Sequence, residues 1–395
     1  MNLVPPLTKG GLGGVPIHIQ HLAFTPEHRQ QLNANIATYL SDYRESTWGE
    51  ALSTRLEAIS QSLHLDSIRA KLPETIQKLI LVPHCDLHLI PLHALSLEGK
   101  LLQDCYPNGV QYVPSCQFLE RLQQRQRHSP NKPPFFAIQN PTEDLAYTDL
   151  EVEAISCGFN PDTHLLKRRE ATKMAFNSPA TQAKLRLAYY AHFSCHGSFN
   201  FSYPLNSALI LAEATATPSP PPEATPEGEK RYVTIRDGRR FDTTIQGLTL
   251  REIFANLDLP VCRLITLSAC ETGLVDTAST DEYIGLASGF LYAGATNVVS
   301  SLWSVSDLST AFLMIYFYRE LAEKPSVSVP VALKTAQNWL RTVAKKDLLE
   351  WIGKNKLTLN SIQQIYLDKH LYNKEDNYQP FVSPFYWAAF CAIGR

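Results

Sequence analysis

Two short segments of the chain bring together residue types that can form a nucleophile and its base. The segment "YYAHFSCHGSFN" (189–200) places His192 and His196 where an apolar run ends, and "LITLSACETG" (264–273) ends another apolar run at Cys270. A free thiol, with a pKa of about 8.5, is only partly ionised at neutral pH, and a nearby imidazole can take its proton during attack. The sequence therefore predicts a cysteine nucleophile with a histidine base.

A glycine beside the histidine suits the same chemistry. Gly197 follows His196 directly, and its lack of a side chain lets a substrate carbonyl approach the backbone. Its N–H can then donate to a developing oxyanion, with the N–H of Cys270 as a second donor. The loss of one such donor typically lowers the rate by about 10²–10³-fold.

The elements around these residues follow an α/β pattern. Amphipathic helical segments separate many of the short apolar runs. The runs are 79–83, 135–139, 187–193, 207–212, 263–269 and 297–303. Such alternation predicts a mainly parallel sheet with helices on both faces, and ligands of such sheets bind beyond the carboxyl ends of strands. We therefore expect residues 196 and 270 to meet at one edge of the sheet.

Composition and charge exclude several classes of protein. The 395 residues are 44% hydrophobic and 19% charged, with a net charge of -2. This balance speaks against a dedicated nucleic-acid or membrane-surface binder. The sequence has neither an apolar run of membrane-spanning length nor a recognisable leader, so we expect a cytoplasmic protein. The eight cysteines form no C-x-x-C pair, and we expect neither a metal nor a cofactor.

The chain divides into two predicted regions. Residues 1–74 read as a helical region in which Thr25 caps a helix that starts at Pro26. Residues 75–395 form the α/β domain. Within it, 213–245 contains "ATATPSPPPEATPEGEKR", which has almost nothing to bury, so we expect a flexible surface insertion there.

The motifs, taken in order, resemble a known family. "HFSCHG", then "LSACETG", then "GLASGFLYAGATNVVSSLWSVSD" are similar to the CHAT family, caspase-like domains named for their association with TPR repeats and the heterocyst protein HetF. The resemblance spans about 75–395 and implies a three-layer α/β/α sandwich and a cysteine endopeptidase related to caspases, gingipains and separases. It also implies that His196 is the base and Cys270 the nucleophile. His192 lies inside the strand run, so we expect a hydrogen-bonded core histidine there, and we expect Cys195 to be a packing residue.

The same resemblance implies a substrate preference. Separases carry a similar tryptophan-then-aspartate pattern, which would place Asp307 at the floor of a pocket for a substrate arginine, with Trp303 on its wall. A carboxylate pairs well with a guanidinium, so we expect cleavage after Arg, with Lys second. Glu282 matches an acidic position of the family and would help to bind a basic residue. The alternative for Asp307 is that it caps the following helix.

The resemblance also bears on regulation and on an alternative function. The resemblance implies a protein substrate and a TPR-containing or other regulatory partner, because related peptidases are often held inactive. An arginine-specific enzyme would also find Arg231, Arg236, Arg239 and Arg240 in its own insertion, which predicts autoprocessing. The alternative is a catalytically silent caspase-like scaffold that binds a protein partner.

Overall fold

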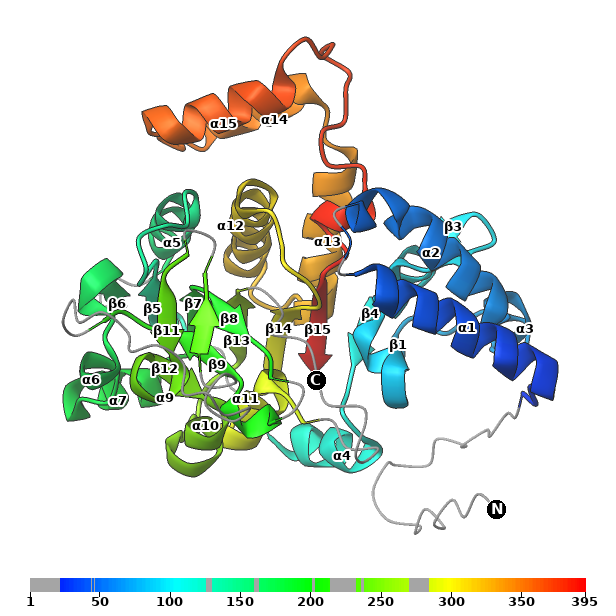
Figure 1. The fold of residues 1–395 in the computed structure, drawn as a ribbon, viewed down its shortest axis with the longest axis horizontal. Helices are drawn as coiled ribbons and strands as arrows, with labels where there is room; N and C mark the ends of the chain where they lie inside the picture. Colours follow the sequence, from blue (N-terminus) through cyan, green and yellow to red (C-terminus); the bar gives the residue numbers. More distant parts are fainter. Residues whose placement is uncertain are drawn as a thin grey trace.

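A computed structural model describes residues 22–43, 45, 47–125, 130–159, 163–200, 203–213, 232–235, 238–269 and 284–395. An eight-stranded sheet runs through its centre (Figure 1). In sheet order the strands are β1 (Leu79–Leu81), β4 (Val110–Tyr112), β15 (Phe390–Gly394), β14 (Asn297–Ser301), β13 (Leu264–Ser268), β7 (Tyr190–Ser194), β5 (Phe135–Gln139) and β6 (His164–Lys167). All neighbours are parallel except β14 and β15, which are antiparallel. The predicted mainly parallel sheet is confirmed.

The central strands are buried along their whole length. Every residue of β5, β7, β13 and β14 is buried, as expected for strands covered by helices on both faces. This is why their sequences read as continuous apolar runs rather than as an alternation of apolar and polar residues. The apolar runs therefore located these strands correctly.

Helices cover both faces of the sheet (Figure 1). One layer holds α5 (Thr148–Ser156), α12 (Asp307–Glu323) and α13 (Val329–Thr342). The other holds α4 (Cys116–Gln124), α6 (Lys173–Phe176), α7 (Pro179–Leu187), α10 (Leu250–Asn256) and α11 (Leu286–Ala293). Aromatic contacts separate the two faces: Tyr318 of α12 packs on Phe135, whereas Phe290 of α11 packs on Phe193. The predicted three-layer α/β/α sandwich is confirmed.

The N-terminal helices pack onto the same core. They are α1 (Pro26–Asp42), α2 (Trp48–Ser62) and α3 (Leu65–Arg69). As predicted, Thr25 is the N-cap of α1 and accepts a hydrogen bond from the His28 N–H at 3.3 Å. The ring of Trp48 in α2 meets the ring of Trp303 edge-on, with centroids 5.2 Å apart. Helix α2 is therefore anchored in the domain that carries the sheet.

Short strands, which pair antiparallel, and short helical turns surround the sheet. They are β2 (Ser96–Leu97), β3 (Lys100–Leu101), β8 (Gly197–Ser198), β9 (Ala208–Ile210), β10 (Tyr232–Thr234), β11 (Arg240–Asp242), α9 (Thr243–Gln246) and β12 (Gly247–Thr249), with 3₁₀ turns at Cys85–Leu89, Leu92–Ala94, Leu102–Cys105, Arg168–Glu170, Pro204–Asn206 and Pro384–Tyr386. The run 207–212 was expected in the main sheet, but it forms β9 of a separate sheet, β12-β9-β8. The reason is that β8 follows β7 almost at once and turns back to pair with β9, and an antiparallel pair needs only a short connection.

The last part of the predicted insertion packs into the fold. Residues 214–231 and 236–237 lie outside the described residues. After Gly238, however, the chain forms β11 and α9, with Phe241 1% and Thr243 2% exposed. The boundary at 245 was therefore wrong, because the last part of this segment belongs to the packed fold.

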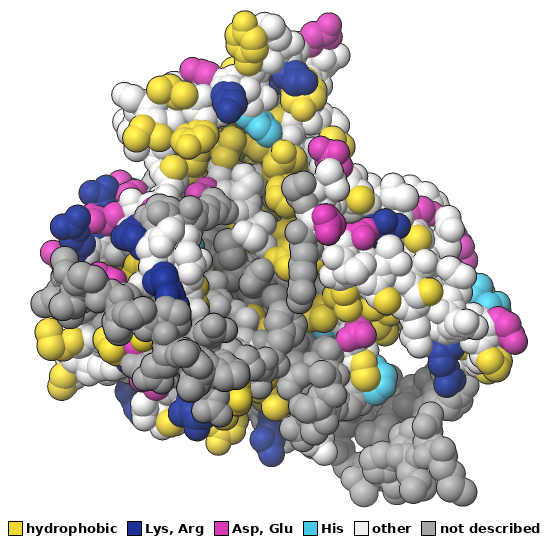
Figure 2. Space-filling model, in the orientation of Figure 1, with side chains coloured by type: hydrophobic (Ala, Val, Ile, Leu, Met, Phe, Trp, Pro, Cys, Tyr) yellow, Lys and Arg dark blue, Asp and Glu magenta, His cyan; other side chains and the backbone are white. Residues whose placement is uncertain are grey.

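Two helices that the sequence did not predict project from the body of the molecule (Figure 1). They are α14 (Lys345–Lys354) and α15 (Ser361–Leu371). The Gln363 side chain ties α15 to the body by donating to the Ala146 carbonyl at 2.8 Å. Hydrophobic side chains gather on this arm (Figure 2), among them Ile362, Ile365 and Tyr366, each more than half exposed. Across the described ranges, the structure offers no helix with the length and hydropathy needed to cross a membrane.

Candidate active site

Three strands deliver their carboxyl ends to one edge of the sheet. In the parallel ladder of β7 and β13, Ser194 lies opposite Ser268, and β14 continues the parallel series. His196 therefore lies two residues beyond Ser194, and Ala269 lies one residue beyond Ser268. The Ser301 hydroxyl at the end of β14 donates to the Ala269 carbonyl at 2.6 Å, which joins these strand ends.

Cys270 and Glu282 lie outside the described residues. Their roles therefore remain predictions, whereas the flanking strand and its register belong to the described fold.

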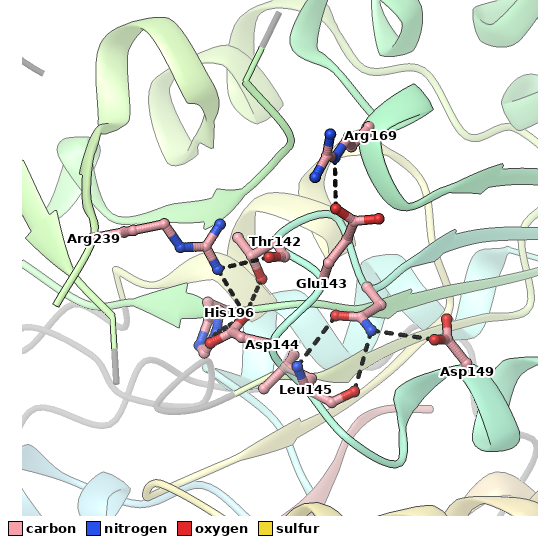
Figure 3. A network of polar contacts seen from close by, with 9 residues as sticks. Thr142, Glu143, Asp144, Leu145, Asp149, Arg169, His196 and Arg239 are labelled. Atoms are coloured by element: carbon pink, nitrogen blue, oxygen red, sulfur yellow. Dashed lines mark hydrogen bonds and ion pairs between the residues drawn. The ribbon is translucent and has the colours of Figure 1, made fainter. Parts of the chain in front are cut away.

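His196 is held firmly at this edge (Figure 3). The residue is 7% exposed, and its Nε2 lies 2.9 and 3.0 Å from the two carboxylate oxygens of Asp144. Its carbonyl accepts a hydrogen bond from the Ile210 N–H at 2.8 Å. A neutral imidazole that donates from Nε2 keeps its lone pair on Nδ1, so Nδ1 is the nitrogen available to accept a proton.

The carboxylate of Asp144 is itself held by two partners. The Thr142 hydroxyl donates to it at 2.5 Å, and the Arg239 guanidinium, 3.8 Å away, also donates to the Thr142 carbonyl at 2.7 Å. Partial burial on its own would raise the pKa of Asp144. The hydrogen bonds from His196 and Thr142 and the charges of His196 and Arg239 outweigh burial, and they lower this pKa from 3.8 to about 2. Asp144 is thus an anion at any pH at which a cysteine peptidase would work.

The loop that carries Asp144 is rigidly built. It leaves the end of β5 at Asn140, whose φ of 46° turns the chain sharply. The Asn140 side chain braces the loop by donating to the Leu145 carbonyl at 3.1 Å and accepting from the Leu145 N–H at 3.3 Å. Glu143 is paired with Arg169 at 2.6 Å on the outer side (Figure 3).

The sequence analysis missed Asp144 as a functional residue. A usable signal was present, because β5 is the parallel neighbour of β7. A polar residue that follows β5 therefore reaches the same edge as His196.

Gly197 presents its amide away from the small sheet. Because the His196 carbonyl accepts from the Ile210 N–H, Gly197 and Leu209 form a pair of the ladder that is not joined by hydrogen bonds. The Gly197 N–H therefore points away from β9. This orientation is compatible with the predicted donation to an oxyanion.

A cleft of about 750 Å³ lies beside this edge. Asp144 and Asp307 line it, together with the apolar side chains of Val305 and Leu308, and Tyr366 of α15 lines it as well. Asp307 also borders a second, small cavity of about 20 Å³ that His196 borders as well. The structure thus brings Asp307 and His196 together.

Asp307 is the first residue of α12, and the N-cap is Ser306. The alternative that Asp307 caps this helix was therefore wrong by one position. A carboxylate in the first turn is still favoured by the helix dipole.

Comparison with known proteins gives the family. A family model of the CHAT domain matches residues 53–395. The chain belongs to the CHAT family. No curated protein matches the chain.

Solved structures similar to this CHAT domain include a separase–securin complex and an Arg-specific cysteine proteinase. The separase–securin complex of Saccharomyces cerevisiae matches with a TM-score of 0.42 and 16% identity, over 78% of this chain and 19% of that chain. The chain therefore spans less than a fifth of the separase it matches. The Arg-specific cysteine proteinase gingipain R (RgpB) matches with a TM-score of 0.41 and 12% identity, over 85% of this chain and 66% of that chain. The complex of Porphyromonas gingivalis RgpB pro- and mature domains matches with a TM-score of 0.39 and 11% identity, over 93% and 76%.

Trp303 of the CHAT domain points into the core. It is 1% exposed, and its indole N–H donates to the Phe385 carbonyl at 3.1 Å. Its ring packs on Trp48 of α2, and it is not among the described residues that line the cleft. From its position in the core, Trp303 therefore supports the segment that carries Asp307.

His192 is a core residue, as expected. It is fully buried on β7, and its Nε2 lies 2.9 Å from a carboxylate oxygen of Glu151 on α5, which is 2% exposed. The ring N–H is not aligned for a hydrogen bond to that oxygen. Cys195 is also buried, at 1% exposed. Neither residue is placed to meet a protein substrate.

Proposed function

We propose that this CHAT domain is a cysteine endopeptidase in which Cys270 is the nucleophile and His196 the base. One observation carries the proposal: β7 and β13 are parallel neighbours with Ser194 opposite Ser268. The two residues of the predicted dyad each follow one of these strands by the same number of positions. A histidine held at that edge by a carboxylate, with lone pair on Nδ1, is prepared to act as a general base.

The reaction is an acyl transfer in two steps. Nδ1 of His196 takes the proton of the Cys270 thiol, and the thiolate attacks the scissile carbonyl carbon. The N–H groups of Gly197 and Cys270 donate to the oxyanion. The C–N bond then breaks as the imidazolium returns its proton to the leaving amine. Water, deprotonated by His196, hydrolyses the thioester to release the acid and restore the thiol.

We propose that the substrate is cleaved after Arg, with Lys second. The carboxylate of Asp307 lines a cleft whose walls include Val305 and Leu308. Such walls suit the aliphatic stem of an arginine, and the carboxylate suits its guanidinium. Glu282 is proposed as a second acidic contact. Trp303 acts here by supporting the 304–307 segment rather than as a wall of the pocket.

Regulation is proposed to come from a protein partner, such as a TPR-containing protein, or from autoprocessing. Arg239 and Arg240 of the candidate autoprocessing sites lie in the described residues, and Arg231 and Arg236 lie outside them. We propose that the protein acts in the cytoplasm.

The test of this function uses a fluorogenic peptide panel that varies only at P1. Native protein should cleave the Arg peptide fastest and Lys second, and Cys270→Ala should cleave none. Mass spectrometry of a cell extract should then give new N-termini that follow Arg with native protein and not with the variant. A protein that cleaves no better than Cys270→Ala in both assays, including after addition of cell extract as a source of partners, is the catalytically silent scaffold. Turnover after Asp or Leu with none after Arg would overturn the specificity.

A further inference from the structure

We propose that Asp144 is a positioning residue for His196 and that Arg239 moderates its effect, so that Arg239, Asp144 and His196 form a relay that supports the base of the proposed dyad. The kinetic part of this inference rests on the proposed function. The structural part concerns the His196 imidazole alone.

The contact between Asp144 and His196 differs from an ordinary surface ion pair. Both carboxylate oxygens lie within 3.0 Å of Nε2, and the two side chains are only 13% and 9% exposed. Exposed pairs contribute little because water and salt screen them. Here the shielding is substantial and the loop is braced from within by Asn140, so the geometry holds the ring in one orientation.

This contact decides which ring nitrogen carries the proton. A carboxylate accepts but cannot donate while ionised, so it selects the tautomer with hydrogen on Nε2. Nδ1 is then left as the base, and the negative charge stabilises the imidazolium that forms when Nδ1 takes a proton. In the described residues no hydrogen bond reaches Nδ1.

Arg239 also approaches the carboxylate of Asp144 (Figure 3). It approaches Asp144 at 3.8 Å and fixes the loop through the Thr142 carbonyl. A cation there offsets part of the negative charge that His196 experiences. Asp144 and Arg239 should therefore shift the His196 titration in opposite directions. Arg239 precedes β11, in the segment whose earlier part is the predicted insertion, so this residue also connects that segment to the site.

Among the described residues, other charged groups face this site from helices. Glu151 of α5 and Asp307 of α12 border the small cavity beside His196, and Lys369 of α15 lines the cleft that Asp144 also lines. None of them lies on the loop that carries Asp144, so variants at 143, 144, 239 and 240 leave all three in place.

The first experiment is an NMR titration of His196 in the Cys270→Ala protein, which removes coupling to the thiol. The His196 signal is assigned by its loss in His196→Gln. Asp144→Asn should move the midpoint of the imidazole titration to lower pH than in the protein with Asp144, because the imidazolium loses its anion. Arg239→Gln should move the midpoint to higher pH, by less, because its side chain is 47% exposed and therefore screened. The matched controls, Glu143→Gln and Arg240→Gln, should leave it unchanged.

The second experiment is kinetic, in the Cys270 protein with the best P1 peptide. Asp144→Asn should lower kcat/KM roughly 10²-fold or more, the range of a general base that has lost its orientation. Asp144→Glu should recover part of this loss, and Asp144→Asn should add little in a His196→Gln background. Thermal unfolding of each variant shows whether it is folded. If Asp144→Asn does not fold, Arg239→Gln still tests the inference.

The outcomes separate the two proposals. An unchanged His196 midpoint in Asp144→Asn, or a shift of Arg239→Gln to lower pH, overturns the relay whether or not the protein is a peptidase. Absence of peptidase activity in the native protein overturns the proposed function and leaves the titration as the test of the relay.

Discussion

Ser194 of β7 lies opposite Ser268 of β13 in a parallel ladder. This pairing links two segments that are far apart in the sequence and gives them a common edge of the sheet. His196 follows the first serine by two residues and Cys270 follows the second by two. Because parallel strands leave a sheet at the same side, the register is the physical basis on which the proposed dyad rests.

The two histidines of the "HFSCHG" segment should respond differently to substitution. His192→Leu removes the contact between the imidazole and the buried Glu151 and leaves that carboxylate with only the Ser194 hydroxyl at 3.5 Å, so it should cost about 1–3 kcal/mol of unfolding free energy, whereas the folded protein keeps its activity. His196→Gln should leave stability within about 1 kcal/mol and lower kcat/KM by about 10²–10⁴-fold. Urea unfolding and peptide cleavage measure the two effects. Loss of activity in a folded His192→Leu protein would reverse this assignment.

Asp307 should control the choice of P1 residue. Asp307→Asn removes the charge that pairs with a guanidinium, so the preference for Arg over a neutral isostere such as citrulline should fall by about 10-fold or more. The control is Asp347→Asn, because Asp347 also stands in the first turn of a helix, α14. That variant matches the change in helix-dipole interaction. Equal loss of Arg preference in both variants would contradict a direct role for Asp307.

Acid should weaken the fold partly through Asp144. Its pKa in the folded protein, about 2, lies below its ordinary 3.8. The stabilisation is therefore complete above about pH 4 and is lost as the pH falls towards 2, and a shift of this size is worth on the order of 2 kcal/mol. Unfolding free energies measured between pH 5 and 2 should fall less steeply for Asp144→Asn than for the native protein. Parallel curves for the two proteins would contradict the shift.

Gly294 should be intolerant of a side chain. Its φ is +127°, and a Cβ there would lie 2.6 Å from the Leu259 carbonyl oxygen. Gly294→Ala should cost about 1–3 kcal/mol of stability. The control is Gly353→Ala in α14, where a Cβ meets nothing within 4 Å and should stabilise the helix by about 0.5–1 kcal/mol. Thermal melts of the two variants should therefore shift in opposite directions.

The sequence by itself determined the main sheet and the edge at which chemistry is proposed. Buried parallel strands require apolar residues at every position, so runs such as 135–139 and 263–269 located β5 and β13 directly. Burial and periodicity are local properties, and a local reading of the chain can find them. The same reading identified His196 and Gly197 as residues at a strand end.

Only the tertiary structure decided what surrounds His196. Asp144 is 52 residues away from it, and Arg239 is 97 residues away from Thr142, so no periodic pattern joins them. The structure likewise turned Trp303 into the core against Trp48 and moved 208–210 into a separate sheet. These outcomes depend on which segments pack together across long stretches of chain, and that choice is made by the whole fold rather than by any one segment.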